Sequence, residues 1–326
     1  MNESRNVSDQ DHIVFPTANG VSILVCLLAV ILVFILKLHK KVVYRLALYQ
    51  VLAAFAVATV AVLQTVMINY NTSPNVYGRV CTFLGWMLLY AEWMKLLFTM
   101  WVTFHLFCFA VFQKNLKKLE VLYVVTSLLV PAVIAAVPLI TNSYGLSPDG
   151  AVCYMYAENE AAFIERFALW DGPALLMLLT ASSAMAFMLI KLTRKVFCRS
   201  NYEPISDGDQ FWKALKHLLP LAAFPILFLV FEIPVLLYHI YAAVDAVPSL
   251  TAQFTSSVFF SLWSTTSGLT LIVHVFVARG YCRKRTHKNI SVDENMTSYC
   301  NITAEKNITG SKMKSTTHFS LPPMSI

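Results

Sequence analysis

The sequence predicts an all-α membrane protein, a seven-transmembrane helix bundle with its N-terminus outside and its C-terminus in the cytoplasm. Three observations carry this prediction. Of the 326 residues, 57% are hydrophobic and 13% are charged, and the mean hydropathy is +0.62. Apolar runs that reach the roughly 20 residues of a bilayer-crossing helix occur seven times. Basic residues gather in every second loop between these runs.

This composition excludes a soluble globular protein, because too little polar sequence remains to cover a core built from so many apolar runs. The net charge of +7 raises the question of a nucleic-acid partner. The basic residues lie in short loops between apolar runs, however, where membrane topology places them. We therefore expect membrane lipid and no nucleic acid among the partners.

The seven apolar runs are residues 18–37, 44–68, 80–112, 119–140, 167–191, 215–241 and 252–277. The first is not a cleaved signal peptide, because the segment before it is acidic on balance and a basic cluster at 37–41 follows it. The runs divide the chain into a short extracellular N-terminus (1–17), a transmembrane domain (18–277) and a largely disordered cytoplasmic tail (278–326).

The distribution of Lys and Arg orients the bundle. The first, third and fifth loops and the start of the tail hold eighteen of them, whereas the opposite side holds only Arg5, Arg79 and Arg166. Because cytoplasmic loops carry the excess of basic residues, the N-terminus is expected outside and the C-terminus inside.

Glycosylation sequons at Asn2, Asn6 and Asn71 agree with this orientation. Four further sequons lie in the tail, at Asn289, Asn295, Asn301 and Asn307. An even number of spans would place the tail outside, but the basic cluster at 279–288 argues against that. We interpret the tail sequons as chance in a disordered segment rich in Asn, Ser and Thr.

Two of the seven cysteines fall on the predicted outer side. Cys81 stands at the outer end of the third run and Cys153 lies in the loop after the fourth, so an oxidising exterior should join them. The disulfide would hold the loop 141–166 over the bundle as a lid. Cys282, beside basic residues near the inner face, is a palmitoylation candidate, as is Cys198; unmodified thiols fit equally well.

Glu92 and Lys95 lie on one helix face at spacing i, i+3. Glu92 is about 16 Å along the helix from Cys81, which places the pair near the middle of a bilayer core about 30 Å thick. Ionisable groups at that depth often mark function. Two interpretations stay open: a neutralised internal pair, and a lock whose partners change when a ligand binds.

Two more acids lie within the runs. Asp171 could cap a helix or pair with Arg166, and Glu232 could hydrogen-bond a neighbouring helix; together with Glu92 they could also form an acidic cavity. Six aromatic residues are placed to line it, although packing explains them as well: Trp86, Tyr90, Trp93, Tyr154, Trp170 and Tyr238. No His spacing indicates a metal site, and we expect no cofactor.

Two features favour a bundle that moves. The sixth run contains Pro220, Pro225 and Pro234, which favour a kink. The seventh contains the small polar stretch 264–268 (STTSG), which tolerates close packing and local unwinding.

Three stretches carry a resemblance to a known family: LEVLYVVTSLLVP (Leu119–Pro131), VCYM (Val152–Met155) and FALWDGPALL (Phe167–Leu176). With the seven runs and the two outer cysteines, the chain resembles the seven-transmembrane G-protein-coupled receptors. It is most similar to the cyclic-AMP-receptor-like group, which is related to the secretin and adhesion receptors. The sequence CFAVFQ at Cys108–Gln113 replaces the acidic-Arg-Tyr triplet, and NPxxY is missing, which speaks against the rhodopsin-like class.

The resemblance implies a plasma-membrane receptor, not an enzyme, that binds an extracellular ligand and signals through a heterotrimeric G protein. The expected contacts for that protein are basic residues of the inner loops: Lys114, Lys117, Lys118, Lys213 and Lys216. The Ser/Thr-rich tail is a candidate site for an arrestin. The alternative is a seven-helix transporter or a proton or cation channel that uses Glu92, Asp171 and Glu232; a zinc-dependent membrane hydrolase is a more distant one.

Overall fold

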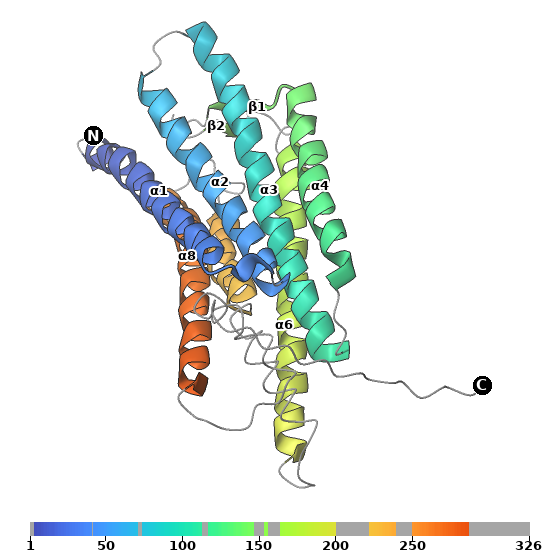
Figure 1. The fold of residues 1–326 in the computed structure, drawn as a ribbon. Coiled ribbons are helices and arrows are strands. Elements are labelled where there is room, and N and C mark those ends of the chain that lie inside the picture. The colour runs from blue at the N-terminus through green and yellow to red at the C-terminus, as the bar shows by residue number, and fades with distance from the viewer. Residues whose placement is uncertain are drawn as a thin grey trace, which may run out of the picture. The chain divides into compact units, whose positions relative to one another are not determined.

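The structure is a computed structural model of residues 1–326 (Figure 1). The described residues are 3–40, 42–70, 74–112, 117–146, 153–155, 164–199, 222–238 and 250–286. The chain divides into the units Met1–Ala278 and Arg279–Ile326, and of the second unit only residues 279–286, the end of a helix that begins in the first, are described.

Helices form almost all of the described chain. The long ones are α1 (Glu3–Ile35), α2 (Val42–Tyr70), α3 (Pro74–Phe112), α4 (Glu120–Ile140), α6 (Gly172–Arg199) and α8 (Leu250–Thr286). A further apolar helix spans Ala222–Tyr238. The short elements are η1 (Leu38–Lys40), η2 (Lys117–Leu119), the π-helical turn η3 (Phe167–Asp171) and the strands β1 (Tyr144–Leu146) and β2 (Cys153–Met155).

Among the described residues, six helices are long and apolar enough to cross a membrane: Phe15–Ile35, Val42–Met67, Gly78–Phe112, Glu120–Ile140, Ile164–Lys191 and Val258–Val277. Their outward faces are apolar; on α4, for example, Val133 is 69% exposed and Ile140 80% exposed. Side chains of this kind need lipid around them. A helical protein with several membrane spans is therefore confirmed. The sixth predicted run is described only over Ala222–Tyr238, so the count of seven stays a prediction.

Two helices extend beyond the predicted apolar runs. The first helix begins at Glu3, so most of the predicted N-terminal segment is helical, while its apolar span begins at Phe15. The third helix begins at Pro74, six residues before the predicted run at 80. The apolar run marks the part of a helix that lipid surrounds, whereas backbone hydrogen bonding continues beyond it. Proline at the first helical position suits such a start.

α3 stands at the centre of the bundle, where it packs against α2, α4, α6 and both strands (Figure 1). Its two ends pack into two different cores. The core nearer the hairpin, here the disulfide half, is rich in aromatic side chains: Trp93, Tyr144, Trp170, Phe228, Phe231 and Trp263. The other core, here the salt-bridge half, contains mostly aliphatic and small side chains: Ala29, Val33, Leu46, Ala47, Val51, Ala54, Leu106 and Val275.

α1 and α8 meet along a seam of small polar side chains. Asn19 Nδ2 donates to Ser261 Oγ at 3.0 Å, and Ser22 Oγ donates to the Ser261 carbonyl at 3.2 Å. A Cβ added to Gly268 would lie 3.2 Å from the backbone nitrogen of Cys26. The close packing expected of the small residues in α8 is confirmed. The local unwinding is not found, because α8 is helical from end to end.

Candidate functional site

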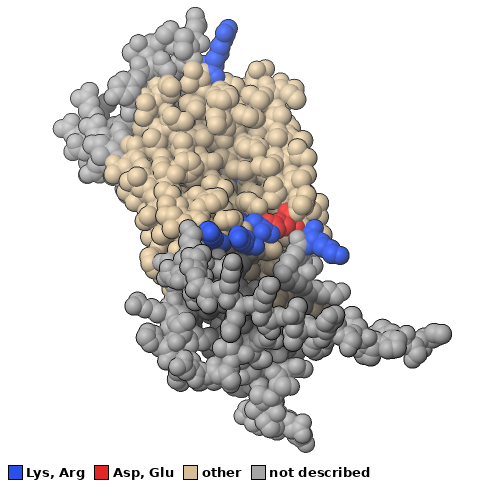
Figure 2. All heavy atoms as spheres, viewed as in Figure 1, with Lys and Arg blue, Asp and Glu red and all other residues tan. Residues whose placement is uncertain are grey.

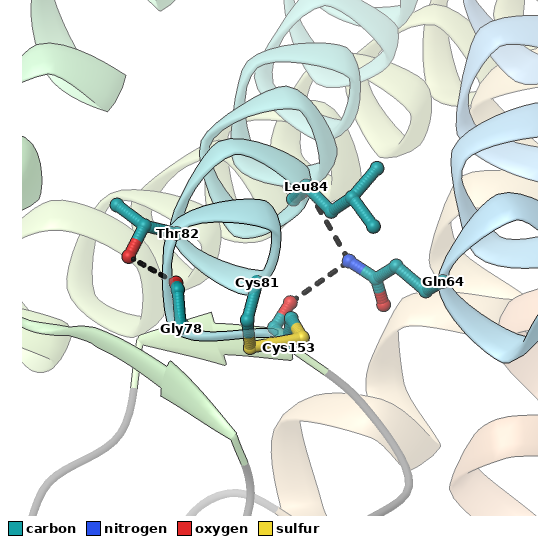
Figure 3. The surroundings of a disulfide bond; sticks show 6 residues. All are labelled: Gln64, Gly78, Cys81, Thr82, Leu84 and Cys153. Atoms are coloured by element: carbon teal, nitrogen blue, oxygen red, sulfur yellow. Dashed lines mark hydrogen bonds between the residues drawn. A yellow bond between two sulfur atoms is a disulfide. The ribbon is translucent and has the colours of Figure 1, made fainter. Parts of the chain in front are cut away.

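The β-hairpin is covalently attached to α3. Cys81 and Cys153 form a disulfide with their Cα atoms 5.2 Å apart (Figure 3), as the sequence predicts. β1 and β2 are antiparallel, with Gly145 opposite Tyr154 and Leu146 opposite Cys153. The bond closes a sequence separation of 72 residues, so it restricts the unfolded chain strongly.

Gln64 of α2 fixes the hairpin from the other side. Its Nε2 donates to the Cys153 carbonyl at 2.9 Å and to the Leu84 carbonyl at 3.2 Å (Figure 3). Gly85 lets β1 approach α3, because a Cβ there would lie 2.9 Å from Tyr144 Cδ1. The hairpin is thus held against two helices by the disulfide, by the Gln64 hydrogen bond to Cys153 and by the close contact of the Tyr144 ring with Gly85.

Polar contacts secure the hairpin at α4 as well. Tyr144 donates its hydroxyl to the Ala135 carbonyl at 2.9 Å, and burial raises the pKa of Tyr144, so the hydroxyl stays a donor. Just before β1, Thr141 and Ser143 donate to the two carboxylate oxygens of Glu165 at 2.7 and 2.6 Å. These contacts join the end of α4 to the start of the next span.

Tyr154 connects the hairpin to the bundle interior. Its hydroxyl donates to Glu92 Oε2 at 2.8 Å, and Glu92 is only 4% exposed. Burial and the nearby Glu92 carboxylate raise the pKa of Tyr154 well above its usual range. The tyrosine therefore stays protonated, and its hydroxyl can donate a hydrogen bond to Glu92.

Lys95 has no hydrogen-bond acceptor, although it is fully buried. Its Nζ lies 3.5 Å from the centre of the Trp263 ring and 4.9 Å from the centre of the Phe260 ring. Both rings belong to α8, so the charge of an α3 side chain rests against an aromatic face of another helix. Such a cation–π contact contributes about 2 kcal/mol when desolvated.

Glu92 and Lys95 interact electrostatically but form no direct ion pair. Within the described residues, the ion pairs closer than 4.0 Å join Arg45 to Glu120 and Arg166 to Asp171. Spacing along a helix places two side chains on one face, but each then takes the partner that the neighbouring element offers. Glu92 accepts a hydrogen bond from Tyr154 of the hairpin, and Lys95 contacts the Trp263 ring of α8.

Asp171 pairs with Arg166, one of the two alternatives expected for it. Arg166 Nε lies 3.5 Å from Asp171 Oδ2 across the π-helical turn η3. Trp93 Nε1 donates to the Leu169 carbonyl in the same turn at 3.1 Å, and its ring meets Trp170 edge to face at 6.0 Å. A π-helical turn is often found at a functional site, and here it brings α6 and α3 together.

Glu232 lies on the helix Ala222–Tyr238 and is 2% exposed. It interacts electrostatically with Lys95, and Glu92 does so too. Glu92 and Glu232 also act on each other, and Asp171 acts on Glu232, so the four predicted intramembrane charges are linked. Trp86 and Tyr90 are half-buried and stacked at 5.9 Å on α3, and Tyr238 is half-buried.

The other predicted sites are mostly outside the described residues. These are Lys114, Lys213, Lys216, Asn2 and Asn71, together with the side chains of Lys117, Asn6, Cys198 and Cys282. Lys118 is exposed. Near it in the sequence, Glu120 forms a bidentate salt bridge with Arg45. On the face in Figure 2, Lys and Arg gather with an acidic group along one edge of a broad uncharged band, and a basic side chain also stands at the opposite end of the band.

Two contributors to the site were missed from the sequence. Gln64 carries a usable signal, because a polar residue inside an apolar run usually bonds a neighbouring element. Trp263 carries none, because an aromatic residue in a span packs far more often than it binds a charge. In the described part of the chain, no group of three or more His, Cys, Asp or Glu side chains is placed to bind a metal.

In the comparisons with known proteins, no family model matches this chain and no curated protein aligns with it significantly.

Proposed function

We propose that this protein is a cell-surface G-protein-coupled receptor with seven spans, an outside N-terminus and a cytoplasmic C-terminus. The observation that carries the proposal is the bond between Tyr154 and Glu92. It joins a disulfide-held hairpin to a buried charge in the central helix. A molecule that reaches the hairpin can therefore act on the bundle interior without a long chain of intermediates.

The mechanism we propose begins at this bond. A ligand that enters under the hairpin competes with Tyr154 for Glu92 and changes the field at Lys95. Lys95 contacts α8 and interacts electrostatically with Glu232. The change in the electrostatic field at Lys95 would therefore reach the helix Ala222–Tyr238. That helix contains Pro225 and Pro234, which remove backbone hydrogen bonds and ease bending. Bending displaces the inner loops that would contact the G protein.

The resemblance to the cyclic-AMP-receptor-like group supports the same proposal at the level of layout. It adds the plasma membrane as location, glycosylation at the outer sequons and an arrestin as a second intracellular partner. The separation of basic from uncharged surface agrees with a chain that spans a bilayer (Figure 2).

The test is a second-messenger screen in cells that express the full chain with each G-protein family, with and without an agonist library. The variant Lys213→Ala/Lys216→Ala should reduce agonist or basal signalling at unchanged surface expression. Lys40→Ala, an exposed basic residue of η1, serves as the matched control. Unchanged coupling in the double variant would contradict the proposal.

A transporter or channel is the second candidate, because Glu92, Asp171 and Glu232 are all buried within membrane-length helices or beside them. Transporters commonly contain two related halves, and the sequence shows no such repeat. Proton or cation flux into proteoliposomes separates the two candidates: a flux that Glu232→Gln abolishes favours transport.

A further inference from the structure

The cluster of Glu92, Lys95 and Glu232 also indicates the chemistry of its ligand. We propose that it binds a small zwitterion, a molecule with one carboxylate and one ammonium group. The carboxylate would accept hydrogen bonds from Lys95, and the ammonium would lie between Glu92 and Glu232. This inference deepens the proposed receptor function and rests on it for the role of the bound molecule.

Lys95 is buried without a hydrogen-bond acceptor. An ammonium group has three donors, and Lys95 Nζ has no acceptor for any of them at 0% exposure. The Trp263 ring covers one side of the group at 3.5 Å, which replaces only part of the lost hydration. Buried charges are normally paired and hydrogen-bonded. An acceptor oxygen is therefore the missing partner.

The second step is the pair of carboxylates. Glu92 Oε2 already accepts from Tyr154, and Glu232 is 2% exposed on the facing helix. Both act electrostatically on Lys95, and they act on each other. Neither carboxylate comes within 4.0 Å of Lys95 Nζ among the ion pairs of the described residues. Both acids thus act on Lys95 without bonding it, and an ammonium group added to the cluster would meet two carboxylates.

The third step is the balance of charge. When all three groups are ionised, the cluster carries one net negative charge. A simple anion that approached Lys95 would meet two carboxylates, and a simple cation would meet the ammonium of Lys95. A molecule with both groups satisfies each end at once. The aromatic rings of Phe260 and Trp263 offer an apolar wall for the short spacer between its charges.

The experiment uses the full chain in lipid nanodiscs and measures its thermal unfolding. The zwitterionic probes are glycine, β-alanine and 4-aminobutyrate; butylamine and butyrate carry one charge each. At least one zwitterion should raise the Tm by about 2 °C or more, because a ligand that binds only the folded state stabilises it. The singly charged probes should have no effect. Failure of all three zwitterions, or equal effects of butylamine or butyrate, would overturn the inference.

Two variants locate the binding. Lys95→Met should weaken the best zwitterion by about tenfold or more, since a charged hydrogen-bond donor is lost, and it should let butylamine bind. Glu232→Gln should weaken the zwitterion and improve butyrate. Lys40→Met, a surface lysine, should change nothing. If Lys95→Met does not fold, the change in selectivity of Glu232→Gln decides alone; unchanged zwitterion affinity in it contradicts the inference.

The same probes separate this inference from the receptor function. A zwitterion that binds with the expected selectivity but alters no second messenger supports the site and contradicts the receptor. An agonist without a zwitterionic group, whose signal survives Lys95→Met, supports the receptor and contradicts the site.

Discussion

The two halves of the bundle differ in how completely their charges are paired. In the salt-bridge half, Arg45 and Glu120 bond each other through two pairs of atoms, and Tyr49 adds a third contact at 3.4 Å. In the disulfide half, Glu92 and Lys95 are more deeply buried and do not bond each other. One half satisfies its charges internally, whereas the other leaves a full ammonium without an acceptor.

The packing of the two halves differs in the same sense. The salt-bridge half consists mostly of aliphatic and small side chains, with Tyr44, Tyr123 and Phe224 among them, and small residues let membrane helices approach closely. The disulfide half is filled with large aromatic rings and is closed by a hairpin. In the salt-bridge half, the paired charges of Arg45 and Glu120 stabilise the fold. The proposed ligand site rests on the unpaired ammonium of Lys95 in the half that the disulfide-held hairpin closes.

The largest effect should come from the cover itself. Cys81→Ala or Cys153→Ala should each lower the free energy of unfolding by about 2–5 kcal/mol, since a native disulfide that closes a long loop is lost. The measurement is the Tm in nanodiscs with and without reductant. Cys108→Ala, at a buried free cysteine, should stay close to the wild type. If the Tm does not fall when either bridge cysteine is replaced, the disulfide does not stabilise this half of the bundle.

Next comes the bond between the hairpin and the bundle. Tyr154→Phe should cost about 1.5–3 kcal/mol, because a buried carboxylate loses its hydrogen-bond donor. Tyr90→Phe, which keeps the stack on Trp86, should change stability by less than about 0.5 kcal/mol. Thermal unfolding of both variants gives the comparison. Equal costs would show that Glu92 does not depend on the hairpin.

A smaller effect is expected in the salt-bridge half. Arg45→Met and Glu120→Met should each cost about 1–2 kcal/mol, because both side chains are partly exposed, 31% and 14%, and water replaces part of what is lost. A double-mutant cycle isolates the pair, and the double variant should cost less than the sum of the singles. Additive costs would mean that the two side chains act independently.

The smallest effect concerns close helix packing. Gly268→Ala should cost about 1 kcal/mol, because its Cβ would lie 2.9 Å from Val25 Cγ1 and 3.2 Å from the Cys26 backbone nitrogen. Gly20→Ala, which meets nothing within 4 Å, should instead stabilise α1 by about 0.5–1 kcal/mol. Unfolding of the two variants is measured side by side. A gain in both would show that α1 and α8 can separate at no cost.

Much of this site could be predicted from residues alone. The disulfide followed from the position of two cysteines on one side of the membrane, and the burial of Glu92, Lys95 and Glu232 followed from their place in apolar runs. The partners of those charges could not be predicted in the same way. Tyr154 and Trp263 are 62 and 168 positions away from Glu92 and Lys95, and helical periodicity says nothing about which neighbour a face meets.

The sequence by itself determined that this chain crosses a membrane several times and that charge is buried in it. Polar groups are costly in lipid, so membrane-spanning segments must be long apolar runs, and the few charges within them are expected to be buried. The tertiary structure alone decided which charges are paired. That choice depends on the rotation of each helix against its neighbours and on a hairpin tyrosine, and these follow from packing between segments far apart in the chain.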